Sequence, residues 1–335
     1  MAINPIKEST TLTFNELLTR DRTSLMGCAM IAIMLFHEYF IPQYTVTHFF
    51  RLYGHWGVEM FLLISGFGIA HSLSKNSTRR YYGNRAKRLI PSCLIAGLCK
   101  YFLGLAGFIE IKTQSFLLLV TNIYLWYIYA IVVYYAMAPL IYRLLKRYST
   151  LALLAICLAS VLCRFIPLES HPEYLVNKLA WVNARLPIFV LGMYLALKPL
   201  KINLRTLFLA GLPFLAVSMA LIILRKLGHV WNLPFDYLLM LPATLSICIV
   251  GHESIRLINR LKCGAVLEFF GKYSLELYLW HEFVYWNIDE HYFFKELSMP
   301  VKFLTGVVVS ILLAYLTHVI EQRLMGQLSG TSTSK

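Results

Sequence analysis

Residues 54–73 read GHWGVEMFLLISGFGIAHSL, and residues 78–91, shortly after them, read TRRYYGNRAKRLIP. The first stretch is mainly apolar and has the length of about 20 residues that a helix needs to cross about 30 Å of hydrocarbon. The second stretch carries five Lys and Arg residues, and such cations gather in the cytoplasmic connections of membrane proteins. An apolar run followed by a basic connection predicts a membrane protein whose orientation follows from its charges.

The composition of the whole chain fits a lipid environment. Of the 335 residues, 58% are hydrophobic and 14% are charged, and the mean hydropathy of +0.62 exceeds that of an ordinary soluble fold. The chain has 31 Lys and Arg against 17 Asp and Glu, a formal charge of +14, which in a soluble protein would suggest a nucleic-acid partner. In a chain this apolar the excess indicates orientation in a bilayer, so we expect lipid and no nucleic acid as partner.

Ten apolar runs are candidates for membrane spans. Because hydrocarbon cannot hydrogen-bond backbone amides, each run must be a helix or part of a closed barrel, and runs this long without strict alternation exclude the barrel. We therefore predict an all-α, polytopic integral membrane protein with about ten transmembrane helices. The runs lie near residues 24–42, 56–74, 89–108, 116–140, 150–167, 184–199, 205–224, 236–253, 265–287 and 301–321.

The charges between these runs give the orientation. Every even-numbered connection is basic, as at 75–88 and 143–147, whereas the odd-numbered connections mix both signs, as at 289–296. By the positive-inside rule the even connections and both termini face the cytoplasm. We expect three parts: a cytoplasmic N-terminal segment at 1–23, one transmembrane domain at 24–322, and a short flexible cytoplasmic tail at 323–335.

Two ionisable residues in the first span, His37 and Glu38 in MIAIMLFHEYF, do not belong in lipid. The span begins near Ser24, so a rise of about 1.5 Å per residue places His37 about 20 Å deep, in the outer third of the membrane. A neutral imidazole there is suited to take a proton from a hydroxyl group. A histidine that is merely hydrogen-bonded at a helix interface fits the sequence as well.

The second span combines an acidic residue with small ones. Glu59 lies near its outer end, and Ser65, Gly66 and Gly68 lie at mid-depth. Small residues let another backbone or a thin ligand approach closely. Helix packing and a ligand passage therefore explain the cluster equally well.

The basic stretch after the second span holds two arginines, Arg85 and Arg88, that share one helical face at i and i+3. Paired guanidinium forks suit the phosphates of a ligand that carries a nucleotide. Attraction to anionic lipid headgroups explains the same charges.

A polar stripe runs along the ninth span, in GKYSLELYLWHEFVY. Its members recur at steps of three and four residues, so they share a helix face, and such a face must meet protein or a water-filled cavity. A ligand site and an interhelical hydrogen-bond seam both fit. The members are Gly271, Ser274, Tyr278, His281 and Tyr285.

Two further polar sites lie in other spans. Arg185 enters the sixth span from the outside, where it reaches either lipid headgroups or an internal oxyanion. Glu321 follows His318 by three residues at the cytoplasmic end of the tenth span, and we expect a structural pair there.

Taken together, these segments resemble acyltransferase family 3, the polytopic bacterial O-acyltransferases that modify surface and secreted glycans. The resemblance covers nearly the whole chain, and its strength lies in the order of the pieces, since none is specific alone. In order they are the histidine late in the first span, GVEMFLLISGFG, the RxxR of Arg85 and Arg88, LWYIYA followed by Pro139, RLPIFVLG, and FFGKYSLELYLWH.

The resemblance implies a multi-pass protein of the bacterial inner membrane. Its donor would be a cytoplasmic acyl-coenzyme A, with acetyl-coenzyme A expected, and its acceptor a hydroxyl of a surface polysaccharide or its lipid-linked precursor. We expect no metal, since the seven cysteines form no CxxC pair. The site residues predicted on this basis are His37, Glu38 and Glu59 for catalysis, Arg85, Arg88, Ser65 and Gly66 for the donor, and Arg185, His281, Tyr278 and Ser274 for the acceptor or oxyanion.

One departure from the family pattern concerns the donor. Many members carry an arginine eleven positions before the histidine, and this chain has Met26 there, with Arg22 one helical turn earlier. Two other classes of function remain open, a transporter or flippase for a lipid-linked glycan and a non-catalytic membrane scaffold. Transporters often consist of pseudo-symmetric halves, and the sequence has no such internal repeat.

Overall fold

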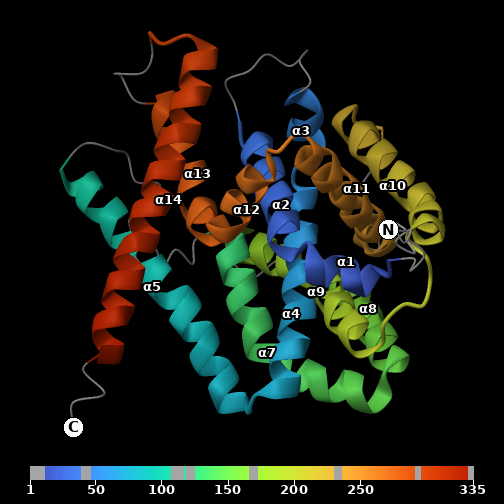
Figure 1. Ribbon diagram of the computed structural model, residues 1–335. Coiled ribbons are helices and arrows are strands. Elements are labelled where there is room, and N and C mark those ends of the chain that lie inside the picture. The colour runs from blue at the N-terminus through green and yellow to red at the C-terminus, as the bar shows by residue number, and fades with distance from the viewer. Residues whose placement is uncertain are drawn as a thin grey trace, which may run out of the picture.

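The computed structural model describes residues 12–38, 47–106, 117, 125–165, 173–229, 236–290 and 296–330. Nearly all of these residues are helical, and the described ranges contain no strand. In chain order the helices are α1 (Phe14–Arg20), α2 (Arg22–Phe36), α3 (Thr47–Tyr53), α4 (Trp56–Lys75), α5 (Thr78–Leu105), α7 (Trp126–Tyr148), α8 (Thr150–Cys163), α9 (Glu173–Leu197), α10 (Leu204–Lys226), the 3-10 helix η1 (Asp236–Leu239), α11 (Met240–Arg260), α12 (Gly264–Lys272), α13 (Ser274–Glu290) and α14 (Met299–Gly330) (Figure 1).

The protein is a multi-pass, all-helical membrane protein. Within the described ranges, seven helices are long and apolar enough to cross a bilayer, namely α4, α5, α7, α9, α10, α14, and η1 with α11. The first and fifth predicted spans coincide with the shorter apolar helices α2 and α8. The total of ten spans and the location of the termini stay predictions.

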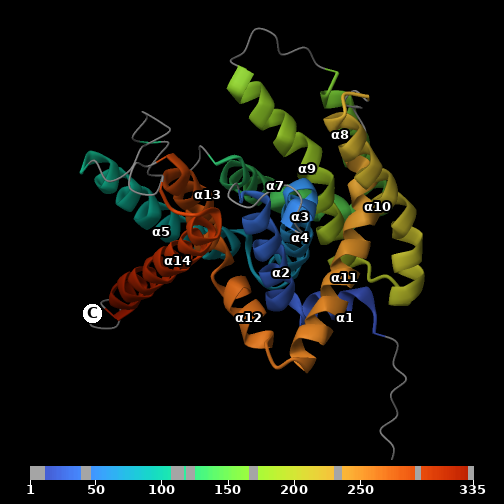
Figure 2. The ribbon, with the colours of Figure 1, turned by 90° about the horizontal axis from the view of Figure 1, so that it is seen from above.

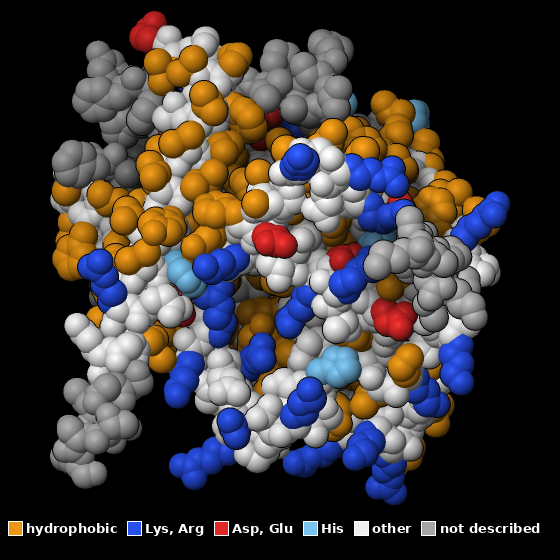
Figure 3. Space-filling view, in the orientation of Figure 1, with side chains coloured by type: hydrophobic (Ala, Val, Ile, Leu, Met, Phe, Trp, Pro, Cys, Tyr) orange, Lys and Arg blue, Asp and Glu red, His pale blue; other side chains and the backbone are white. Residues whose placement is uncertain are grey.

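Helices α2 and α4 lie at the centre of the bundle. Seen from above, α5, α13 and α14 lie on one side of this pair, and α8, α10 and α11 lie on the other (Figure 2). On one face of the molecule, Lys and Arg gather over the lower part, where α4 ends and α5 begins, whereas the part over α13 and α14 is mainly hydrophobic (Figure 3). This separation of charged and apolar surface is the one that the sequence predicts for a membrane protein.

The basic stretch forms the first turns of α5. Ser77 is its N-cap, and the side chain of Ser77 accepts a hydrogen bond from the backbone N–H of Arg80, which satisfies a donor that the helix start leaves unpaired. Arg85 and Arg88 therefore lie on one continuous helix with the third apolar span. This helix fixes both guanidinium groups relative to the membrane domain.

Helix α1 begins with a capping box, in which Thr13 and Glu16 satisfy each other's backbone and side-chain groups. The backbone and side-chain hydrogen bonds from Thr13 lower the pKa of Glu16. The apolar residues of α1, Phe14, Leu17 and Leu18, are fully buried. Helix α1 lies crosswise at the lower end of α2 (Figure 1). The last part of the predicted N-terminal segment thus packs against the domain.

Two glycines bring α4 and α9 into backbone contact. A Cβ atom on Gly66 would lie 2.0 Å from the carbonyl oxygen of Phe189, and one on Gly192 would lie 2.1 Å from that of Leu63. Only glycine permits so close an approach. The packing interpretation of the small-residue cluster therefore holds for Gly66.

The structure corrects one predicted element. The ninth span is not one continuous helix, because the chain turns at Tyr273 between α12 and α13. The turn has a packing reason: α12 crosses α2 so closely that a Cβ on Gly271 would lie 1.8 Å from the carbonyl oxygen of Thr23. The tail predicted from residue 323 stays a prediction, and α14 continues into it as far as Gly330.

Candidate active site

Two histidines from distant parts of the chain meet where α2 ends. His37 is the C-cap of α2, and its Nδ1 lies 3.2 Å from Nε2 of His281 on α13. The ring centroids are 5.0 Å apart. His281 is fully buried, whereas His37 is partly exposed. His281 therefore contacts the His37 ring from the interior of the protein.

The hydrogen bonds around the two rings determine where the protons lie. His281 Nδ1 is 3.0 Å from the carbonyl oxygen of Leu277 and 3.1 Å from that of Tyr278. Because carbonyls only accept hydrogen bonds, this Nδ1 carries the proton, and His281 Nε2 offers a lone pair to His37. His37 Nδ1 also lies 3.0 Å from the carbonyl oxygen of Ile33, so it must donate. The neutral His37 ring then keeps an unprotonated Nε2, which is the form that a general base needs.

His37 lines a cavity of about 260 Å³, called here the histidine cavity. Its other polar members are His55, Arg185 and Tyr278, and aromatic rings supply much of the remaining wall, from Phe36, Trp126 and Trp181. Proton acceptor, cation and apolar walls together make a site for a small polar substrate.

Arg185 is held in place from two sides. Its Nε lies 3.0 Å from Oε1 of Glu59, and its guanidinium carbon lies 4.7 Å from the centre of the Trp126 ring. Glu59 is buried and does not line the histidine cavity. The predicted catalytic carboxylate thus orients Arg185 and neutralises part of its charge.

A second cavity, called here the basic cavity, has a volume of about 160 Å³ and lies at the other end of α2. Three arginines contribute to it, Arg22, Arg85 and Arg88, together with Met26, Ser65, Tyr127, Ser274 and Tyr278. Figure 3 shows a hollow bordered by Lys and Arg side chains on this face. Tyr278 lines both cavities, so its side chain lies between them.

The three arginines of the basic cavity differ in their partners. Arg88 makes a two-point contact with Glu276, at 2.7 and 3.2 Å. Arg22 and Arg85 make no ion pair among the described residues, and they are close enough to repel each other. The buried Nε of Arg85 has no hydrogen-bond partner. Arg22 and Arg85 are therefore the pair that an anionic ligand would neutralise.

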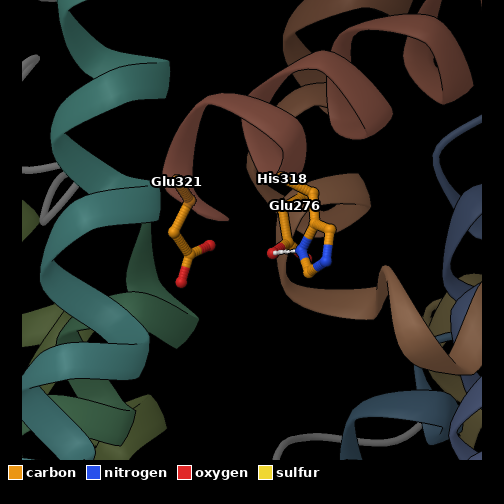
Figure 4. A group of neighbouring side chains, drawn as sticks. All are labelled: Glu276, His318 and Glu321. Carbon is orange, nitrogen blue, oxygen red and sulfur yellow. Dashed lines mark hydrogen bonds and ion pairs between the residues drawn. The ribbon is translucent and has the colours of Figure 1, made fainter. Parts of the chain in front are cut away.

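Arg88 belongs to a cluster that joins α5, α13 and α14. His318 Nδ1 lies 3.2 Å from Glu276, and Glu321 accepts a hydrogen bond of 2.6 Å from Ser92. Figure 4 shows Glu276 and His318 in contact, with Glu321 on the side toward α5. The sequence predicted that His318 pairs with Glu321, but in the structure His318 pairs with Glu276. The ligand atoms of Glu276, His318 and Glu321 lie within 4.8 Å of one another, and a cation there would have to compete with Arg88 for Glu276.

Four predicted site residues line neither cavity, and one of them is Glu59, the partner of Arg185. Gly66 packs against α9, as described above. Glu38 is buried and interacts electrostatically with Tyr285 on α13. His281 contacts His37 and does not line the histidine cavity, so the structure gives no support to its predicted contact with the acceptor. Ser274 lines the basic cavity, on the side opposite to its predicted place.

Sequence reasoning missed three residues of the histidine cavity: His55, Trp126 and Trp181. His55 precedes Glu59 by four residues in the same segment, a spacing that places both on one helix face, so this signal was present. The two tryptophans carry no such signal, because an aromatic residue near a membrane surface usually serves as an anchor.

A comparison with protein families agrees with this geometry. The model of family Acyl_transf_3, described as an acyltransferase domain, matches residues 25–319. The chain belongs to acyltransferase family 3. The match includes α4 to α13 entirely, most of α2, and α14 as far as His318 and its neighbour. Neither a curated protein nor a solved structure matches the chain.

Membership of acyltransferase family 3 makes the protein a membrane acyltransferase. The site agrees with this activity, since acyl transfer needs a base for the incoming nucleophile and a positive charge for the developing oxyanion. His37 and Arg185 line one cavity, and their side chains are of the types that these two roles require.

Proposed function

We propose that the protein transfers an acyl group, with acetyl as the expected one, from cytoplasmic acyl-coenzyme A to a hydroxyl of a carbohydrate. One observation carries this proposal: α2 holds Arg22, which has no ion pair within the described ranges, at its first residue and His37 just after its last. At about 1.5 Å per residue, the 15 residues of α2 separate them by about 22 Å. A long donor bound by its phosphates at one end would present its thioester at the other.

Arg22 and Arg85 would bind the phosphates of coenzyme A. They face the same cavity and have no counter-charge among the described residues, and guanidinium groups bind phosphate through charge-assisted hydrogen bonds. Arg22 would then do the work of the arginine that many family members carry at the position of Met26. The pantetheine arm would pass Ser65 and Tyr278 toward His37.

His37 Nε2 would act as the general base. It removes the proton from the acceptor hydroxyl while that oxygen attacks the thioester carbonyl carbon. The Arg185 guanidinium stabilises the oxyanion. The carbon–sulfur bond then breaks, and the thiolate of coenzyme A receives the proton from His37, leaving an ester and a free thiol. In the alternative, His37 Nε2 itself attacks the thioester carbon and the thiolate leaves. The acceptor hydroxyl then attacks the acyl-histidine, His37 is released, and the hydroxyl proton passes to the thiolate.

The walls of the histidine cavity support a carbohydrate acceptor. Trp126, Trp181 and Phe36 give it flat apolar surfaces, which suit the C–H faces of a sugar ring, while its hydroxyls find Arg185 and Tyr278. An acceptor that enters from the outer face of the membrane would thus meet the donor beside His37.

The test is the transfer reaction of the purified full-length protein with radiolabelled acetyl-coenzyme A and the glycan of the source cell. His37→Ala should remove nearly all transfer, because a general base typically contributes about 10²- to 10⁴-fold. Acetyl-coenzyme A binding and the melting temperature should stay near those of the wild type. Transfer by His37→Ala above a tenth of the normal rate would exclude this role, and a wild type that releases no thiol at all would favour the transporter or scaffold.

A further inference from the structure

An apolar groove opens on the flank of the molecule between α7, α8 and α9. Its volume is about 630 Å³, and its walls are mainly hydrophobic. The exposed residues of α8, such as Leu154 and Leu158, are 60% and 59% accessible, as expected of a helix that faces lipid. The groove is lined by Met137 on α7, Ala159 on α8 and Leu186 on α9, among others.

The groove ends at a cation. Arg164, the C-cap of α8, lines both the groove and a neighbouring pocket of about 280 Å³, called here the arginine pocket. Its guanidinium carbon lies 5.5 Å from the centre of the Tyr237 ring, and it makes no ion pair among the described residues. A charge at the end of an apolar groove is the arrangement that an anionic amphiphile requires.

The arginine pocket offers mostly hydrogen-bond donors. It contains three arginines, Arg164, Arg185 and Arg225, against one carboxylate, Glu59. Trp56 and Ser218 also line it, both are 6% exposed, and in both the side-chain polar atom is buried without a hydrogen-bond partner. A ligand with several acceptor oxygens and a negative charge would satisfy these groups, and phosphate has both properties.

The arginine pocket lies beside the histidine cavity. The two share the wall residues His55, Trp181 and Arg185. Apolar groove, arginine pocket and histidine cavity are therefore neighbours in this order, with Arg164 shared by the first two.

We propose that the acceptor saccharide is bound while it is attached through a phosphate to a long-chain polyprenyl lipid. The polyprenyl chain lies in the apolar groove, the phosphate binds at Arg164, and the saccharide reaches the histidine cavity. This inference rests on the proposed carbohydrate acylation and adds how the acceptor is held. A free polysaccharide would leave the groove and Arg164 without a role.

Binding of undecaprenyl phosphate to the full-length protein in detergent tests the proposal directly. The wild type should bind it at least about tenfold more tightly than undecaprenol, and also more tightly than phosphatidylglycerol. Arg164→Ala should weaken binding about tenfold or more, and Arg164→Lys should restore part of it. Equal affinity for undecaprenol and undecaprenyl phosphate would overturn the proposal, as would equal affinity for phosphatidylglycerol.

Matched variants separate the groove from general effects of substitution. Ala159→Trp fills the groove and should weaken binding, whereas Leu154→Trp on another face of α8 should not. Arg143→Ala removes an exposed cation from α7 and should leave the affinity unchanged. Melting temperatures of all variants identify any that fold poorly. Identical effects of Ala159→Trp and Leu154→Trp in well-folded protein would contradict the groove assignment.

A transfer assay distinguishes this inference from the proposed function. The wild type should acylate a polyprenyl-phosphate saccharide faster than the same free saccharide, and Arg164→Ala should slow only the lipid-linked reaction. If both saccharides react equally in both proteins, the lipid site is wrong and the acylation stands. If undecaprenyl phosphate binds as expected but no saccharide is acylated, the lipid site stands and the proposed function fails.

Discussion

Replacing His281 tests whether the histidine pair forms a working unit. His281 Nε2 accepts the Nδ1–H of His37 at 3.2 Å, so it holds the ring and would stabilise the imidazolium that forms on His37 during transfer. A hydrogen bond to a charged group contributes about 1.5–3 kcal/mol. At about 1.4 kcal/mol per factor of ten, His281→Ala should lower kcat about 10- to 150-fold.

The expected pattern distinguishes this positioning role from loss of packing. Since His281 does not line either cavity, the KM values for donor and acceptor should change little. His281→Gln should recover much of kcat, because the amide oxygen can accept the same hydrogen bond from His37. Steady-state rates with acetyl-coenzyme A, at saturating and limiting acceptor, give both constants.

Two results would refute the reasoning about His281. One is a large rise in the KM for the acceptor at unchanged kcat, which would return His281 to the acceptor-orienting role that the sequence suggested. The other is equal loss in His281→Ala and His281→Gln with an equally lowered melting temperature, which would indicate packing alone.

Three further predictions follow from the helix contacts. Arg85→Ala should weaken acetyl-coenzyme A binding about tenfold or more. Arg88→Ala should mainly lower the melting temperature, because it leaves the buried Glu276 carboxylate with His318 as its remaining partner; equal loss of affinity in both would show that Arg88 also binds the donor. Gly66→Ala should destabilise the fold by about 1–3 kcal/mol, measured as a lower melting temperature, and an unchanged temperature would contradict the close contact of α4 with α9. In a cysteine-free background, an impermeant thiol reagent added outside should label a cysteine at Glu290 and not one at Arg80; the reverse pattern would invert the topology.

Much of the architecture was predictable because lipid constrains a sequence strongly. Spans must be helical, and apolar length together with basic connections locates them. The exceptions arise where a contact between distant segments decides the local structure. The turn at Tyr273 depends on how closely α12 crosses α2 at Gly271, and a hydropathy pattern does not contain that contact.

The sequence predicted the identity of several site residues better than the contacts between them. The sequence identified His37, Arg185 and Tyr278, and all three line the histidine cavity. It treated Arg85 and Arg88 alike because they share a helix face. Only the folded chain brings Glu276 to Arg88, since that pairing joins residues 188 positions apart. Arg85 has no ion pair within the part of the chain that the structure describes.

The place of Tyr278 has a consequence for the membrane itself. An enzyme that admits one substrate from each side of a bilayer risks becoming a pore for water and ions. Tyr278 belongs to the walls of both the basic and the histidine cavity, and the donor of the proposed reaction would pass it. While the donor lies there, the donor itself would seal the passage. A cell would thus keep its ion gradients during each turnover because the substrate closes the passage that it uses.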